Sequence, residues 1–211
     1  PKPSSAASDV YKRQHMGWTG LGDGVKTPNM DKLAAKSIAF TNAYTNNPVC
    51  APARHSVYTG QYASRHGVIQ NDRPLADDVP TMMELLAESG YTTANVGKMH
   101  FAPYNERHGF QYVLNHEFFD NDAGISHFRP WLEREAKKMG LQAERYPQWN
   151  QSSPPGKWTS DVNSLSFVHD IPIELTSEHW VTDNSIAFIE DQLKQRPDQP
   201  FFLHALSLIH I

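Results

Sequence analysis

Cysteine, clustered basic residues and long apolar runs are all scarce in this sequence. One cysteine in 211 residues excludes an internal disulfide, the usual brace of small secreted domains. The single cysteine does not determine the cellular compartment, and a periplasmic or secreted location is compatible with it. The formal net charge of −4, without dense lysine and arginine, argues against a nucleic-acid partner. Every apolar run is far shorter than a membrane span. The chain is still long enough to bury a sizeable core, as one domain or part of a larger one.

Both ends of the chain differ in composition from the rest. Residues 1–14 (PKPSSAASDVYKRQ) begin with proline rather than methionine and are small and polar, so we expect disorder there. This segment resembles translated sequencing-adaptor DNA, and residues 206–211 (LSLIHI) have a similar character. We therefore interpret both tails as non-native and residues 15–205 as the folded part.

Helical and extended patterns alternate along the folded part. Helical spacing of apolar residues and flanking proline or glycine predict helices over 28–37, 50–60, 80–89, 131–139 and 177–193. Runs of β-formers predict strands over 38–44, 91–96 and 200–205. Such alternation predicts an α/β fold with helices around a largely parallel sheet. Residues 105–173, rich in aromatics, histidine and proline, are interpreted as an elaborated insert.

The lone cysteine lies in the segment NNPVCAPARH. Pro52 suits a first helical turn and Gly60 a helix end, so Cys50 should lie at a helix start, where negative charge is favoured. Arg54, one turn later, would face the same side, so the helix start and the Arg54 guanidinium together could hold sulfate or phosphate oxygens. The alternative is a small buried cysteine beside a surface arginine.

A second cluster follows a predicted strand in the segment GYTTANVGKMH. Lys98 and His100 are two residues apart and would point the same way in an extended backbone. Ligands bind at the carboxyl ends of strands in open α/β sheets, and Gly97 allows a close backbone approach. A cation beside an imidazole could stabilise an anion and move a proton at an oxygen. The alternative is a solvated lysine beside a structural histidine.

The two segments together resemble the two signatures of the sulfatase family. PVCAPARHSVYTG, at residues 48–60, is similar to its Cys-x-Pro-x-Arg signature, and GYTTANVGKMH is similar to its second. Their order and separation also match. Tyr58, where the family usually has an aliphatic residue, is a small departure. Further similarity lies in residues 25–45, 59–68 and 200–207, so the resemblance covers about residues 15–205 and is weakest in the insert.

This resemblance implies an alkaline-phosphatase-like fold and hydrolysis of a sulfate ester. It implies that a formylglycine-generating enzyme converts Cys50 to formylglycine, whose hydrate is the nucleophile. Pro52 and Arg54 would belong to the stretch read by that enzyme, and Arg54 would also brace the modified residue. Lys98 would contact the sulfate oxygens, and His100 would bind the nucleophile's hydroxyl.

The resemblance also implies a divalent cation, commonly calcium with magnesium as the alternative, held by hard oxygen ligands. Formylglycine at Cys50 would be one ligand, beside a pair of aspartates before His15 and an Asp-Asn or Asp-Gln pair beyond Ile211. Neither pair is in this sequence, so we expect an inactive fragment. His210 is not given the role of the family's later sulfate-contacting histidine. Four acidic residues do not match the ligand positions and are interpreted as surface or capping residues: Asp23, Asp31, Asp77 and Asp78.

Two alternative functions stay open at this point. One is hydrolysis of phosphonate monoesters or phosphodiesters, as in relatives that share the formylglycine motif. The other is binding of sulfated glycans without catalysis. The substrate, a sulfated small molecule or glycan, is also open. Residues of the insert could line its pocket or be ordinary surface and core residues: His108, His116, Asp120, Asp122, His127, Trp131, His169 and Asp170.

Overall fold

A computed structural model describes residues 17–20, 26–40, 42–116, 126–141 and 172–206 of the chain. The chain divides into two compact units, 1–79 and 80–211. Both predicted tails lie outside the described residues except for Leu206, which is the last residue of a strand and not the start of a tail. Among the described helices, none has the length and apolarity that crossing a membrane requires.

The first unit contains four short helical elements in its described residues. They are η1 (Gly17–Thr19), α2 (Pro28–Ala34), α3 (Cys50–Thr59) and α4 (Ala63–His66). Helix α2 confirms the predicted helix, although it ends three residues earlier. Asp31 joins α2 to η1, because its carboxylate accepts from the Trp18 N–H at 2.9 Å and from the Thr27 hydroxyl at 2.8 Å.

The strand predicted over 38–44 is wrong for the residues that the structure describes. Residues 38–40 and 42–44 form no strand, and their large side chains are exposed, with Ile38 at 85% and Tyr44 at 89%. β-formers favour a pleated surface only where a neighbouring strand supplies the ladder of hydrogen bonds. No described segment pairs with this one.

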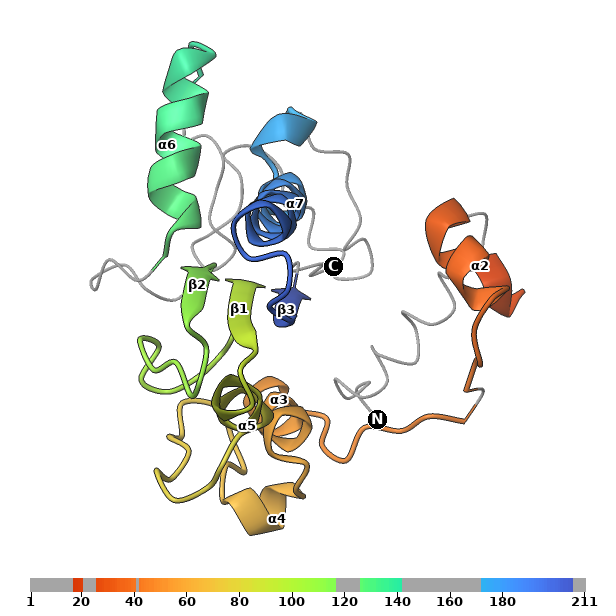
Figure 1. Ribbon diagram of the computed structural model, residues 1–211, viewed down its shortest axis with the longest axis vertical. Helices are drawn as coiled ribbons and strands as arrows, with labels where there is room; N and C mark the ends of the chain where they lie inside the picture. The colour runs from red at the N-terminus through yellow and green to blue at the C-terminus, as the bar shows by residue number, and fades with distance from the viewer. Residues whose placement is uncertain (1–16, 21–25, 41, 117–125, 142–171, 207–211) are drawn as a thin grey trace, which may run out of the picture. The chain divides into compact units, whose positions relative to one another are not determined.

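The second unit is built on three parallel strands. Their order is β2 (Tyr112–Asn115), β1 (Thr92–Gly97) and β3 (Phe201–Leu206), and the three arrows of Figure 1 lie side by side in that order. Both pairs are parallel, with Gly97 opposite Asn115 on one side and Leu206 on the other. Every residue of β1 is buried, as expected of a central parallel strand. The predicted α/β class and parallel sheet are therefore confirmed.

Helices pack against this sheet through apolar side chains. They are α5 (Met82–Glu88), α6 (Phe128–Lys138) and α7 (Ser177–Gln195), with η3 (Ile173–Leu175) before α7. α7 contributes Trp180 and Val181 to a core cluster with Val96 of β1. A capping box at Thr81 and Glu84 starts α5, and Gly90 ends the turn that leads into β1. These contacts place the carboxyl end of β1 inside a packed unit.

Strand β2 was not predicted from the sequence. It lies within residues 105–173, and only Tyr112, Val113 and Leu114 give it β character. Three such residues are too short a run to separate from loop, because β2 exists through its pairing with β1.

Candidate active site

Cys50 and Arg54 lie on helix α3 of the first unit. Cys50 is the first helical residue, after Val49 in an extended conformation, and its thiol is free and partly exposed. Arg54 follows one helical turn later and is half-buried. Residues four apart share a helix face, so the predicted helix start and the shared face are both confirmed.

The start of α3 offers fewer backbone donors than the sequence suggested. The Ala51 N–H already donates to Asn71 Oδ1 at 3.1 Å. Pro52, in the first turn, has no N–H to offer. An anion at this helix end would therefore depend on the helix dipole and Arg54 more than on free amides. Asn71 was missed from the sequence, because nothing local connects it to a helix that begins 21 positions earlier.

A buried serine and histidine also pair on this unit. Ser56 Oγ lies 3.0 Å from His66 Nε2, which resembles a nucleophile beside its base. However, His66 Nδ1 accepts from the Val68 N–H at 3.1 Å, so the proton of the neutral ring is on Nε2. Burial lowers the pKa of His66, and the Pro52 carbonyl partly opposes this shift. His66 therefore donates to Ser56 and cannot take its proton in this tautomer.

Lys98 and His100 lie just past strand β1 in the second unit. The strand ends at Gly97, and His100 has φ +64°, so the expectation of an extended backbone that points both side chains the same way is wrong. Both side chains are buried, Lys98 at 3% and His100 at 4% exposure. The His100 ring stacks near Tyr104 at a centroid distance of 6.5 Å. A non-glycine residue with positive φ in such a loop is held there by its surroundings.

His116 is the first residue after β2 and lies beside this loop. Its backbone N–H donates to the Gly97 carbonyl at 3.2 Å. Its ring meets Phe128 edge-on at 4.4 Å and Trp180 at 6.2 Å. Burial, assisted by the positive charge of Lys98, lowers the pKa of His116 to about 3. The ring is therefore neutral at physiological pH.

The structure describes some of the other insert residues that could line a substrate pocket. His108 packs edge-on against Phe101 at 4.6 Å, and its carbonyl accepts from the Thr81 hydroxyl. His127 Nδ1 accepts from the Asn115 N–H at 3.0 Å. Trp131 joins the aromatic cluster beside Phe128. All three have structural contacts, and four further candidates lie outside the described residues: Asp120, Asp122, His169 and Asp170.

The described residues do not form a metal site. None of them gather in a group of three or more His, Cys, Asp or Glu side chains that could hold an ion. Asp77 and Asp78 are exposed, as expected of surface residues, and the Asp31 carboxylate joins α2 to η1. Asp23 and His210 lie outside the described residues.

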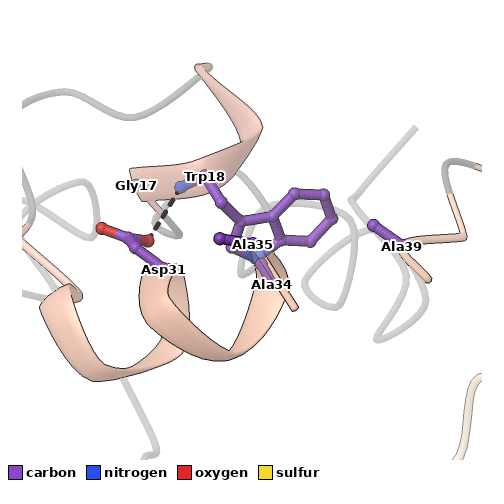
Figure 2. A pocket seen from close by; sticks show the side chains of 6 residues that line it. All are labelled: Gly17, Trp18, Asp31, Ala34, Ala35 and Ala39. Carbon is purple, nitrogen blue, oxygen red and sulfur yellow. Dashed lines mark hydrogen bonds between the residues drawn. The ribbon is translucent and has the colours of Figure 1, made fainter. Parts of the chain in front are cut away.

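One hollow of about 430 Å³ opens beside η1 and α2 (Figure 2). Figure 2 shows the Trp18 ring over Ala34 and Ala35, with Ala39 across from it and Asp31 bonded to the Trp18 backbone. None of Cys50, Arg54, Lys98 or His100 lines it. Its single carboxylate already accepts two hydrogen bonds, so the hollow offers little for binding a charged ligand.

Comparison with known proteins gives consistent results. The sequence matches the Sulfatase family over residues 7–208. It is 40% identical over 184 residues to the uncharacterised sulfatase YidJ of Escherichia coli, covering 86% of this chain and 33% of that protein. It is 40% identical over 105 residues to the choline-sulfatase of Rhizobium meliloti, covering 50% of this chain and 20% of that protein.

A solved structure supports the fold independently. The phosphonate monoester hydrolase of Agrobacterium radiobacter matches with a TM-score of 0.63 and 22% identity, covering 88% of this chain and 36% of that chain. This likeness shows the alkaline-phosphatase-like fold. The chain thus spans only about a fifth to a third of the length of the relatives named here. Because the family match covers almost all of the sequence, including both motifs, the chain belongs to the sulfatase family.

Proposed function

We propose that this chain carries the nucleophile and anion-binding residues of an enzyme that hydrolyses a sulfate ester. The observation that carries the proposal is the position of Cys50. It is the first residue of α3, it is partly exposed, and Arg54 follows on the same helix face. A nucleophile derived from Cys50 at this place is not sealed in the core, and the helix start favours negative charge on it.

In this proposal a formylglycine-generating enzyme acts on Cys50 within the CAPAR segment. One hydroxyl of the formylglycine hydrate attacks sulfur and displaces the alcohol of the ester. Deprotonation of the second hydroxyl then expels sulfate and leaves the aldehyde, which water converts back to the hydrate. Arg54 braces residue 50 from one turn along the helix, and its guanidinium favours negative charge there. The helix dipole acts in the same direction.

Lys98 and His100 supply the remaining polar groups of the proposal. Lys98 contacts the sulfate oxygens, and His100 binds the hydroxyl of the nucleophile and assists release of sulfate. Both side chains are almost completely buried. Charged and polar groups act more strongly on a developing charge where water is excluded.

A divalent cation, calcium or magnesium, is part of the family pattern. The described residues offer no set of ligands that fits one. We therefore derive no step through a cation for this chain. The expectation that the 211-residue chain has no activity by itself stays a prediction, and an assay with 4-nitrophenyl sulfate would test it.

The decisive experiment is conversion of Cys50 during co-expression with a formylglycine-generating enzyme. Peptide mass spectrometry should find residue 50 without its sulfur, and a hydrazide probe should label the protein. Cys50→Ala is the control for labelling, and Arg54→Ala should lower conversion if Arg54 is part of the recognised stretch. An unconverted Cys50 in the wild-type protein would contradict the proposal and favour a non-catalytic protein that binds sulfated glycans.

A second candidate function is hydrolysis of phosphonate esters. The observation that favours it is the match to the Agrobacterium radiobacter phosphonate monoester hydrolase. Turnover of an aryl sulfate and of an aryl phosphonate by the full-length gene product would separate the two. A higher kcat/KM for the phosphonate would show that the enzyme hydrolyses phosphonate esters rather than sulfate esters. Cys50 and Arg54 would keep the same roles.

A further inference from the structure

Two polar side chains face each other in the interior of the parallel sheet. Asn95 of β1 and His204 of β3 are register partners, and Asn95 Oδ1 lies 2.7 Å from His204 Nδ1. Asn95 is completely buried between Ala94 and Val96, which are also completely buried. Burying an amide in a strand whose residues are all buried is costly unless its hydrogen bonds are made. The pair therefore needs an explanation beyond packing.

The other end of the Asn95 amide shows what the pair holds. Asn95 Nδ2 donates to the Gly97 carbonyl at 2.9 Å. An amide nitrogen can only donate, so this bond directs the Asn95 oxygen toward His204. His204 Nδ1 must then carry the proton and donate to that oxygen. Asn95 is thus a bridge from strand β3 to the backbone at the end of β1.

The peptide between Gly97 and Lys98 is held from several sides. The Gly97 carbonyl accepts a second bond, from the His116 N–H at 3.2 Å. The Lys98 N–H donates to the Leu206 carbonyl at 3.3 Å. Gly97 itself has φ +110°, and a Cβ at this position would overlap the Leu206 carbonyl oxygen. β2 and β3 therefore both hold the peptide from which Lys98 and His100 continue.

We propose that Asn95 and His204 are positioning residues that hold the Gly97–Lys98 peptide and so aim Lys98 and His100. The positioning role rests on the proposed function of those two residues. Without the bridge, the Gly97 carbonyl loses one of the two bonds described for it, so the Gly97–Lys98 peptide is held less firmly by its remaining bonds to His116 and Leu206. His100, at φ +64°, then loses part of the framework that keeps it in a costly conformation. A protonated His204 still donates from Nδ1, so the bridge does not depend on its charge.

The test compares variants that cut the bridge with variants that preserve it. His204→Phe removes the donor but keeps a ring, and Asn95→Leu removes the bridge. His204→Asn is the conservative variant, because its amide nitrogen can occupy the place of Nδ1. Thr92→Val is the matched control on β1, since Thr92 Oγ1 is buried and has no hydrogen-bond partner among the described residues.

The first readout is hydrogen exchange of the Lys98 and His100 amides, measured by NMR on the same protein. We expect exchange at least about 10-fold faster in His204→Phe and Asn95→Leu, because opening needs fewer broken bonds. His204→Asn and Thr92→Val should exchange at the wild-type rate. Unchanged exchange in both cutting variants would overturn the proposal, whatever the protein catalyses.

The second readout is steady-state kinetics of the full-length gene product with 4-nitrophenyl sulfate. We expect kcat to fall about 10- to 100-fold in the cutting variants, with the pKa values of the pH profile unchanged, because misplacement alone has this size. His204→Asn should restore most of the rate. Wild-type kcat in both cutting variants would overturn the positioning role and leave the proposed function intact. An inactive wild type with unconverted Cys50 would contradict the proposed function, and hydrogen exchange would then decide on the bridge.

Discussion

The helix that carries Cys50 and the strand end that carries Lys98 are held by contacts of different range. Around α3, Ser56 bonds His66 ten residues away, and Ala51 bonds Asn71 twenty residues away. At the end of β1, Asn95 bonds His204 across 109 residues. The surroundings of Cys50 can therefore form from one short stretch of chain. The surroundings of Lys98 form only when β3 pairs with β1. Bringing these two strands together closes a longer loop and therefore costs more entropy.

This difference suggests a division of labour between the two regions. In the proposed function, a modifying enzyme reads the CAPAR segment, which suits a locally built helix start. The same proposal requires Lys98 and His100 to be placed accurately in a buried loop, which suits strands held by long-range pairing. Three predictions compare the two regions, in order of decreasing effect.

Replacement of one glycine in each region should separate them most clearly. Gly97→Ala should lower the free energy of unfolding by about 4 kcal/mol or more, because its Cβ would overlap the Leu206 carbonyl at φ +110°. Gly60→Ala, at the end of α3, should lower it by only about 1 kcal/mol, because φ is +67° and no described atom beyond the neighbouring residues lies within 4 Å of the new Cβ. Urea unfolding of both variants is the measurement. Equal losses would contradict the comparison.

Acid should weaken the strand-end region more than the α3 region. Burial and Lys98 lower the pKa of His116 from 6.5 to about 3, so the unfolded chain takes up this proton first as the pH falls. The contribution of neutral His116 to the free energy of unfolding is complete above pH 6.5 and is lost as the pH falls from 6.5 to about 3. A shift of this size corresponds to at most roughly 4–5 kcal/mol.

Urea unfolding across that pH range should show a flatter pH dependence for His116→Phe than for the wild type. The pKa of His66, in the α3 region, is also lowered by burial, so it acts in the same direction. His66→Gln is the matched variant, and we expect it to flatten the dependence less than His116→Phe does. If His66→Gln flattened the pH dependence more than His116→Phe, the α3 region would be the more acid-sensitive of the two.

The smallest effect concerns the bond that supports the start of α3. Asn71→Ala removes the acceptor of the Ala51 N–H and should lower the free energy of unfolding by about 1 kcal/mol, as for loss of a helix cap. Asn71→Asp keeps an acceptor at this place and should retain most of the stability. Thermal unfolding monitored by circular dichroism is sufficient for this comparison. A loss as large as that of Gly97→Ala would show that α3 is not locally held.

Several elements were predictable because their signals are local. Pro52 and Gly60 bracket α3, and the sequence-based expectation of Cys50 at the helix start is correct. The helices over 80–89 and 177–193 and the strands over 91–96 and 200–205 correspond to α5, α7, β1 and β3. In each case, caps, apolar spacing or a run of β-formers agrees with the final packing.

Other elements could not be predicted because they depend on partners far away in the chain. Residues 38–44 have strand composition but no described strand to pair with, whereas β2 has a weak pattern and pairs with β1. The non-extended backbone after Gly97 was missed because the positive φ of His100 is imposed by the surrounding loop. The neutral state of His116 depends on burial that no local pattern reports.

The sequence by itself determined the family and the α/β class, and it predicted the four residues on which the proposed chemistry depends. It could do so because short motifs and local caps are written in consecutive residues. Only the tertiary structure decided which strands pair, that Lys98 is buried in the loop after β1, and that Asn95 connects His204 to the Gly97 carbonyl. Those features arise from contacts between residues up to 109 positions apart, and such contacts leave no local pattern.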